Sequence, residues 1–319
     1  MPDQTSSSRS TPRKKNYLRP FVVAALAAIG TTGCLKQLIL EGQIASTRTA
    51  SAAVNTIQDY EVAEKIAMAG LGQMEGFRYL APENEDALFL LTRSWASVAL
   101  GFMEDAMERA EDEEGTGPNW DYHKRRAEAA YDRAVWYGVQ LLEQKAPNFK
   151  DHTKNVATMK AYLQAFEDPE DAETLFWVGN AWLGRANVGK EKPDLVGEIF
   201  IGVTMIERSV ELDPNYMRGT GFTILASYHA RTPMAELDEA KALFEKSLSM
   251  AADKIYLPKV QYATRYLCNK GDKENYVRVL KEVMAAGDGD PYQRLANTIA
   301  KRKASRWLNE KRMRENCGF

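Results

Sequence analysis

The segment from residue 172 to residue 216 most constrains the fold, because it encodes two helices of similar length joined by a turn. Leu175, Val178 and Trp182 recur at i, i+3 and i+7 and therefore share one side of a helix. Gly189 and Pro193 then interrupt the pattern. A second apolar face follows, made of Leu195, Ile199, Met205, Ile206 and Val210, and it ends before Pro214. One helical hairpin alone cannot bury both faces, so the chain must supply neighbouring helices.

Other segments repeat the pattern of this hairpin. The run Leu88–Trp95 (LFLLTRSW) aligns without a gap on Leu175–Trp182 (LFWVGNAW), 87 residues further along, and Phe222–Tyr228 follows the same order of aromatic, aliphatic, small and aromatic residues. Small residues beside a large ring let two helices approach closely. The segment Asp238–Leu248 resembles the second helix of a tetratricopeptide repeat. These patterns predict an all-α fold, an α-solenoid of irregular tetratricopeptide-like helical hairpins.

The composition excludes several classes of function. With 319 residues, 45% of them hydrophobic, the chain can bury a sizeable core, and a formal net charge of −2 gives it no electrostatic reason to bind nucleic acid. The three cysteines, Cys34, Cys268 and Cys317, are widely separated, so we expect neither a disulfide framework nor a zinc site. We interpret Cys268 as a packing residue at the end of an apolar face.

The N-terminal segment has the layout of a secretory signal peptide. A basic run precedes the apolar run Phe21–Ile29, which is too short to span a membrane, and Thr31, Thr32, Gly33 and Cys34 follow. This arrangement resembles a bacterial lipobox, with Thr31 where leucine is usual. We predict removal of residues 1–33, lipidation of Cys34 and a lipid-anchored periplasmic protein, with Leu35 favouring the outer membrane. An ordinary signal peptide with an incidental cysteine, or a buried cytosolic N-terminus, is the alternative.

Residues 34–54 are then a tether that begins the capping helix, and residues 55–319 are a single helical domain. We expect helical segments at residues 35–79, 88–109, 121–145, 259–268, 273–284 and 292–313. The acidic run Glu111–Glu114 lacks the alternating oxygen ligands of a calcium loop, so a solvated loop is expected. The last segment is basic, which is typical of a terminal cap with one solvated face; a membrane-surface or anion-binding helix is the alternative.

Motifs of known chemistry are absent from the sequence. There is no glycine-rich phosphate loop, no nucleophile elbow and no H-E-x-x-H, and His123, His152 and His229 are isolated. We therefore expect no enzyme, no metal and no cofactor. Aromatic and polar residues of the repeated helices are the candidates for a ligand channel inside the superhelix. The candidates are Phe89, Arg93, Trp95, Phe176, Trp177, Asn180, Trp182, Phe222, Tyr228 and His229. For Trp95, Trp182 and Tyr228, packing between hairpins is the alternative.

An ordered set of short motifs runs along the chain. It comprises the lipobox, the two LF-x-x-x-x-S/A-W helices, Gly101–Asp105, Tyr137–Gly138 followed by Leu141 and Leu142, Glu211–Tyr216, and Leu295–Arg302. Together these motifs resemble the T component of tripartite ATP-independent periplasmic (TRAP) transporters, the TatT-type lipoproteins, from about residue 55 onward. The resemblance implies a homotrimer with a channel through each protomer, which binds the periplasmic solute receptor and passes or holds a small organic or hydrophobic ligand.

Two other functions remain open at this point. A tetratricopeptide-type lipoprotein adaptor in envelope assembly would bind peptides or outer-membrane precursors in its groove, so it would retain extended peptides. A cell-wall-active enzyme would need a catalytic carboxylate in a cleft, and the sequence offers no convincing pair.

Overall fold

A computed structural model describes residues 35–231 and 235–319. The predicted signal peptide and the predicted lipidation of Cys34 lie outside these residues. Every regular element within them is a helix, which confirms the all-α fold. The structure divides into Met1–Gln43 and a compact unit, Ile44–Phe319, and the description below concerns the compact unit.

The compact unit begins with the end of a helix that spans residues 35–50. The first half of the unit then contains η1 (Ser51–Thr56), α2 (Tyr60–Leu80), α3 (Glu85–Val98), the π-turn η2 (Ala99–Met103), α4 (Glu104–Glu114), α5 (Pro118–Lys145), α6 (Phe149–His152) and α7 (Val156–Leu163). The long helix expected at residues 88–109 is therefore present as α3, η2 and α4 in direct succession. Asn84 caps α3 by accepting a hydrogen bond from the backbone N–H of Ala87, which explains why this helix starts there.

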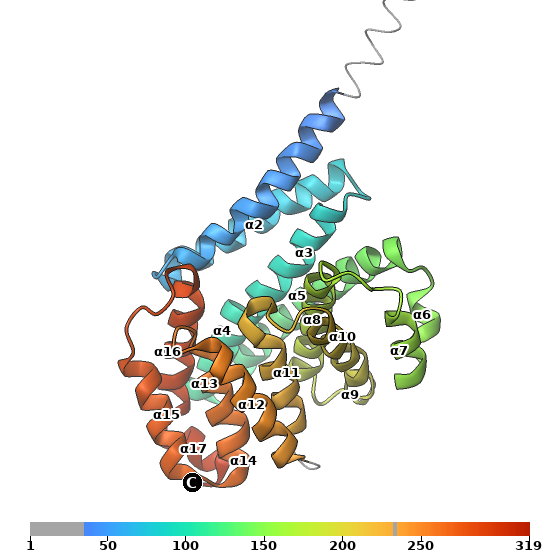
Figure 1. Cartoon of the computed structure of the whole chain (residues 1–319). Helices are drawn as coiled ribbons and strands as arrows, with labels where there is room; N and C mark the ends of the chain where they lie inside the picture. Colours follow the sequence, from blue (N-terminus) through green and yellow to red (C-terminus); the bar gives the residue numbers. More distant parts are fainter. Residues whose placement is uncertain (1–34, 232–234) are drawn as a thin grey trace, which may run out of the picture. The chain divides into compact units, whose positions relative to one another are not determined.

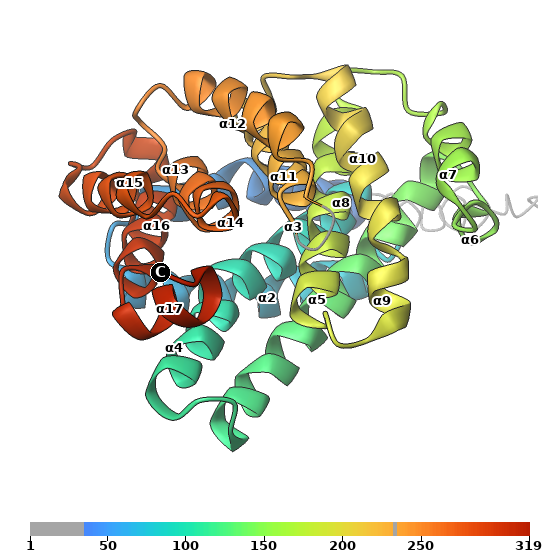
Figure 2. The same ribbon diagram turned by 90° about the horizontal axis from the view of Figure 1, so that it is seen from below.

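The second half contains the hairpin that constrains the fold. Its elements are α8 (Asp171–Val188), α9 (Pro193–Gly197), α10 (Ile199–Leu212), η3 (Tyr216–Gly219), α11 (Thr220–His229), α12 (Leu237–Ala251), α13 (Leu257–Gln261), the π-turn η4 (Tyr262–Leu267), α14 (Cys268–Lys270), α15 (Lys273–Ala285), η5 (Pro291–Gln293), α16 (Arg294–Trp307) and α17 (Glu310–Cys317). The predicted hairpin is confirmed as α8 and α10, with the short α9 in the turn. Both views show α15 and α16 at one side of the unit and α6 and α7 at the other (Figures 1 and 2).

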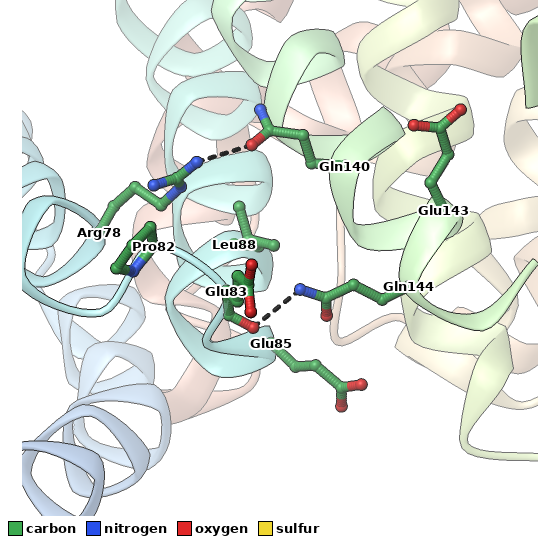
Figure 3. Close-up of a pocket in the computed structure, with 8 residues that line it drawn as sticks. All are labelled: Arg78, Pro82, Glu83, Glu85, Leu88, Gln140, Glu143 and Gln144. Atoms are coloured by element: carbon green, nitrogen blue, oxygen red, sulfur yellow. Dashed lines mark hydrogen bonds between the residues drawn. The ribbon is translucent and has the colours of Figure 1, made fainter. Parts of the chain in front are cut away.

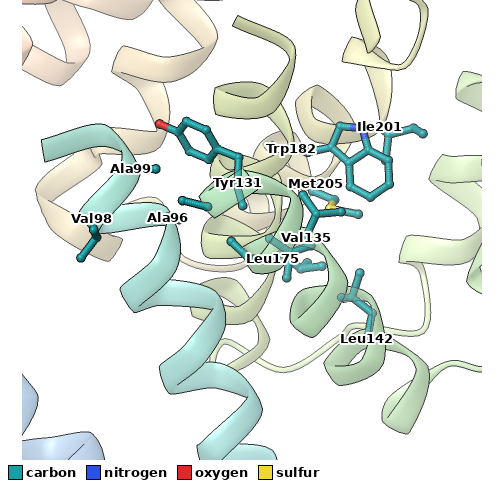
Figure 4. Close-up of a cluster of buried hydrophobic side chains, with 14 of the residues drawn as sticks. Ala96, Val98, Ala99, Tyr131, Val135, Leu142, Leu175, Trp182, Ile201 and Met205 are labelled. Atoms are coloured by element: carbon teal, nitrogen blue, oxygen red, sulfur yellow. The ribbon is translucent and has the colours of Figure 1, made fainter. Parts of the chain in front are cut away.

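Two glycines let α8 and α10 pack closely. A Cβ atom on Gly179 would lie 3.0 Å from the carbonyl oxygen of Gly202, and one on Gly202 would lie 2.7 Å from Leu183 Cγ. Because neither glycine has a side chain, the backbones of the two helices approach each other closely at these positions. The main core lies beside this crossing, and Figure 4 shows part of it, including Tyr131, Leu175 and Trp182.

Successive helices pack on one another along the chain, and the C-terminal helices return to the N-terminal ones. α16 contacts both η1 and α2, and its basic face meets the acidic face of α4. Arg302 and Arg306 each donate to Asp105 at 2.8 Å, and Arg306 also donates to Glu108 at 2.7 Å. Asp105 is only 1% exposed. Burial would raise the pKa of Asp105, but the two guanidinium groups outweigh it and lower that pKa.

This closure corrects two of the sequence-based expectations. Several basic side chains of the last helices are buried and do not lie on a solvated face: Lys303 and Arg312 are each 6% exposed. The acidic run is not a solvated loop either, since Glu111 and Asp112 lie in α4 and both pair with Arg312. The acidic run of α4 and the basic residues of α16 and α17 are about 200 residues apart in sequence. Neither segment alone therefore predicts that the two form ion pairs with each other.

The last helix differs from the prediction of one segment at residues 292–313. It is divided into α16 and α17 because Asn309 accepts a hydrogen bond from the N–H of Lys311 and starts a new helix. The turn brings Cys317 to Cys268, and the two form a disulfide bond. The expectation that Cys268 only packs, and that no disulfide forms, was wrong. Spacing of 49 residues is uninformative by itself, because only the fold brings α14 and α17 together.

Candidate functional site

The ten candidate residues lie in several places. Trp182 and Phe222 are buried core residues, with 6% and 4% of their surface exposed. Trp182 packs edge-on against Phe149, and the guanidinium of Arg185 lies 4.4 Å from its ring centroid. For Trp182, the geometry agrees with the alternative of packing between hairpins.

Tyr228 and His229 lie at the end of α11 and interact with their own surroundings. The guanidinium of Arg231 lies 3.5 Å above the Tyr228 ring, and the His229 ring nitrogen Nδ1 is 2.5 Å from a Glu236 carboxylate oxygen. Trp95, on α3, donates from its indole N–H to Glu75 of α2 at 2.8 Å. Burial would raise the pKa of Glu75, but hydrogen bonds from Arg133, Tyr137 and Trp95 lower it. These residues are anchored by structural networks.

Four of the five remaining candidates, Phe89, Arg93, Phe176 and Trp177, come together where α3 packs against α8. Phe89 and Phe176 occupy equivalent positions of the two aligned helices and are both buried, whereas Arg93 and Asn180 occupy the next equivalent pair and are half-buried. Trp177 is half-buried and contacts the apolar clusters around both phenylalanines. We call Phe89, Arg93, Phe176, Trp177 and their neighbours Arg48, Ser51 and Tyr216 the α3–α8 cluster.

Two guanidinium groups of the α3–α8 cluster share one aromatic ring. The guanidinium carbon of Arg48 lies 4.0 Å from the Phe89 ring centroid, and that of Arg93 lies 5.4 Å from it. Arg48 forms ion pairs with Asp86, at 2.6 Å, and with Glu173. Those two acids also occupy equivalent positions in the aligned helices, so Arg48 joins the first turns of α3 and α8.

Tyr216 forms the other wall of the cluster. Its ring packs edge-on against Phe176, with the ring centroids 5.3 Å apart, and its hydroxyl oxygen accepts a hydrogen bond from the Trp177 indole at 2.9 Å. The residues after it, Met217, Arg218 and Gly219, all have positive φ angles, of 49°, 52° and 75°. Left-handed conformations are unfavourable for the first two side chains and recur at functional sites.

Sequence reasoning missed three members of the cluster. Tyr216 lies within the recognised Glu211–Tyr216 motif, but nothing in the motif places its ring against α8. Arg48 and Ser51 lie in the segment interpreted as a tether, where no periodic pattern marks them. Ser51 accepts a hydrogen bond from Arg93 and donates one to the carbonyl of Arg48 at 2.7 Å. A polar side chain can bridge two arginines in this way only once η1 has packed beside α3.

A separate pocket of about 620 Å³ lies where α2, α3 and α5 meet (Figure 3). At one end Arg78 donates to the side-chain oxygen of Gln140 at 2.8 Å, and at the other Gln144 donates to the backbone carbonyl of Glu83 at 2.8 Å. None of the ten candidate residues lines this pocket. Its charged rim, which includes Glu83, Glu85 and Glu143, is exposed.

The described residues contain neither a candidate metal site nor a membrane-spanning helix. No group of three or more histidine, cysteine or acidic side chains within residues 35–231 and 235–319 has the geometry to hold a metal ion. In the same part of the chain, no helix has the length and apolarity needed to cross a membrane.

Comparison with known proteins identifies the family. The family described as "TRAP transporter T-component" matches residues 56–314. An uncharacterized protein of Treponema pallidum (strain Nichols) is similar to this chain, with 22% identity over 235 residues, which cover 71% of each protein. T components are parts of transporters and are not enzymes, and a part of a TRAP transporter belongs to the cell envelope. The match spans most of the chain, and the chain therefore belongs to the TRAP transporter T-component family.

Proposed function

We propose that this protein is a lipid-anchored, periplasm-facing T component that binds the solute receptor of a TRAP transporter and holds or passes that receptor's ligand. The observation that carries the proposal is the family match over residues 56–314. Lipidation of Cys34, an outer-membrane location and assembly as a homotrimer with a channel in each protomer are parts of the same proposal. They rest on the N-terminal sequence pattern and on the resemblance.

The ligand contacts are assigned to the α3–α8 cluster. Trp177 supplies apolar surface, and Arg93 and Tyr216 supply hydrogen-bond donors. Small-molecule sites combine mostly apolar walls with a few polar groups in this way. Arg93, Trp177 and Tyr216 are each partly exposed, so a ligand can reach them. The buried candidates Phe89, Phe176, Trp182 and Phe222 support the fold around this site.

Binding of the receptor is tested with purified proteins. The full chain and the solute receptor encoded beside the same transporter's membrane genes are mixed, and the complex is measured by sedimentation velocity and calorimetry. We expect saturable binding. A solute receptor of an unrelated transporter serves as the control. Failure of the cognate receptor to bind, together with retention of unfolded envelope polypeptides, would refute the proposal in favour of the envelope-assembly adaptor.

The anchor is tested separately in the native host. Mass spectrometry of the mature protein should show an N-terminal Cys34 carrying acyl chains, and Cys34→Ser should release the protein from the membrane fraction. A mature chain with an unmodified Cys34 that still partitions with membranes would contradict the lipid anchor. Receptor binding in solution does not depend on this result.

A further inference from the structure

Three large apolar side chains are exposed beside the pocket between α2, α3 and α5. Tyr79 and Leu80 are 87% and 63% exposed, and they directly follow the lining residue Arg78 in the chain. Trp136 is 54% exposed and precedes the lining residue Gln140 by one turn on the same face of α5. Exposed apolar groups mark places where another protein binds, and aromatic residues are enriched there. We call these three residues, together with the pocket, the α2–α5 surface.

The pocket of the α2–α5 surface is open and polar. It measures about 620 Å³, and six of its eight lining residues have polar or charged side chains (Figure 3). Pro82 and Leu88 supply the apolar part, and Leu88 is only 1% exposed. Small-molecule sites are mostly apolar and enclose most of their ligand. The pocket therefore suits one polar side chain of a larger partner better than it suits a free small molecule.

The carboxylates of this pocket have no cationic partner in the chain. Glu83, Glu85 and Glu143 are all exposed, and none of them forms an ion pair with any residue that the structure describes. Arg78 is the cation among the eight lining residues, and it donates to the neutral Gln140 at 2.8 Å. Three carboxylates and one guanidinium leave the lining residues with a formal net charge of −2. Such a pocket attracts a cation and disfavours an anion.

The size, polarity and charge of the pocket together indicate its occupant. A lysine or arginine side chain fills a polar pocket with its charged end and supplies the missing positive charge. Apolar residues beside it on the same partner would cover the exposed side chains of α2 and α5. A second copy of this chain, docked through the same surface in a two-fold contact, would bring like charges together. The partner is therefore a different protein with a basic surface.

We propose that the α2–α5 surface binds the solute receptor, with a lysine or arginine of a receptor surface loop inserted between Glu83 and Glu143. This inference rests on the receptor-binding part of the proposed function and adds the surface and the chemistry of the contact. Exposed ion pairs contribute little affinity by themselves, so the aromatic contacts supply most of it. The charges set the orientation of the receptor and its rate of association, which high salt should slow.

Charge reversal tests the pocket. Glu83→Lys/Glu143→Lys should weaken binding of the full chain to the purified receptor at least about fivefold at low ionic strength, mainly through slower association. The matched control is Glu113→Lys/Glu315→Lys, which makes the same change in net charge. It alters exposed glutamates of α4 and α17 that form no ion pair among the described residues. Equal weakening by the two double variants would be an effect of general charge and would overturn the assignment.

Tyr79→Ala tests the apolar part of the surface. Its side chain is 87% exposed, so its removal leaves the packing of the fold in place. We expect receptor binding to weaken at least about tenfold, as for the loss of an aromatic hot spot. Tyr292→Ala removes another exposed tyrosine, 73% exposed in η5, and should leave binding unchanged. If Tyr79→Ala and the reversal of the two pocket glutamates both leave receptor binding intact, the α2–α5 surface is not the docking site.

Binding by the unaltered chain separates this inference from the proposed function. Receptor binding that survives both sets of changes would overturn the surface and leave the transporter role intact. Absence of binding by the wild type would refute the proposed partner and, with it, the surface. Hydrogen exchange of the wild-type complex gives an independent answer: backbone amides of residues 78–88 and 140–145 should become protected. Protection confined to other helices would place the receptor elsewhere. Circular dichroism of each variant excludes unfolding.

Discussion

Breaking the Cys268–Cys317 bond with Cys317→Ser should destabilise the protein by about 4 kcal/mol. The two cysteines are 49 residues apart, and closing a loop of that length removes entropy worth about 4 kcal/mol from the unfolded chain. Cys317 is half-buried near the end of α17, so the serine hydroxyl can meet water and adds little further cost. The loss is therefore mainly an effect on the unfolded state.

The melting temperature and the denaturant midpoint both report this loss. A change of 4 kcal/mol in a chain of this size corresponds to a fall in melting temperature of about 8 °C. Guanidinium unfolding with and without a phosphine reductant is the sharper assay. Wild type should fall to the level of Cys317→Ser when reduced, and the variant itself should not respond. Cys34→Ser is the control, since it leaves both bonded cysteines in place.

Two results would refute the reasoning. One is an unchanged midpoint of the wild type on reduction, combined with alkylation of both thiols in the unreduced native protein. The other is a further large loss when Cys317→Ser is itself reduced. Adding Cys268→Ala to the Cys317→Ser variant should cost only the packing of the Cys268 side chain, which is 6% exposed. The first substitution has already removed the disulfide, so the second cannot remove its constraint on the unfolded chain again.

Three further substitutions test the core and the closure of the fold. Asp105→Asn should cost about 3–5 kcal/mol, because it removes a buried carboxylate that pairs with both Arg302 and Arg306, and Arg306 alone retains other carboxylate partners, Glu108 and Asp112. The pKa of Asp105 is lower in the folded protein than in the unfolded chain. The stability that its carboxylate contributes is therefore complete above the unfolded pKa of about 4, and it is lost as the pH falls through the folded pKa. Asp105→Asn should accordingly lose less stability in acid than the wild type does. Gly184→Ala would place a Cβ atom 2.3 Å from the Tyr131 ring and should cost about 1–3 kcal/mol, whereas Gly197→Ala, with open space, should be nearly neutral. Trp182→Ala should cost about 3–5 kcal/mol in chemical denaturation, and a loss below 1 kcal/mol would place this ring outside the core.

The local pattern of the sequence determined the helices and their repetition. Apolar spacing, glycines and prolines are read over a few residues, and they locate the hairpin of α8 and α10 correctly. The gapless alignment of Leu88–Trp95 on Leu175–Trp182, at an offset of 87 residues, also identified Phe89 and Phe176, and Arg93 and Asn180, as equivalent pairs. Those pairs lie on two helices, α3 and α8, that pack against each other.

Contacts between distant segments were decided by the tertiary structure alone. The pairing of α4 with α16 and α17 joins charges about 200 residues apart, and each run by itself is equally compatible with a solvated face. The disulfide depends on the capping of α17 by Asn309 and on the return of that helix to α14. Neither event has a periodic signature.

The candidate site depends on both the local sequence pattern and the tertiary structure. Sequence periodicity placed Phe89, Arg93 and Trp177 on repeated helices, because their spacing follows the helical period. Only the packed chain brings Arg48, 125 residues before its partner Glu173, and Tyr216 to the same place. Whether an arginine pairs with a carboxylate depends on the segments that pack beside it. The sequence could therefore name Arg93 as a candidate. Only the fold decided that Arg93 has no carboxylate partner among the described residues.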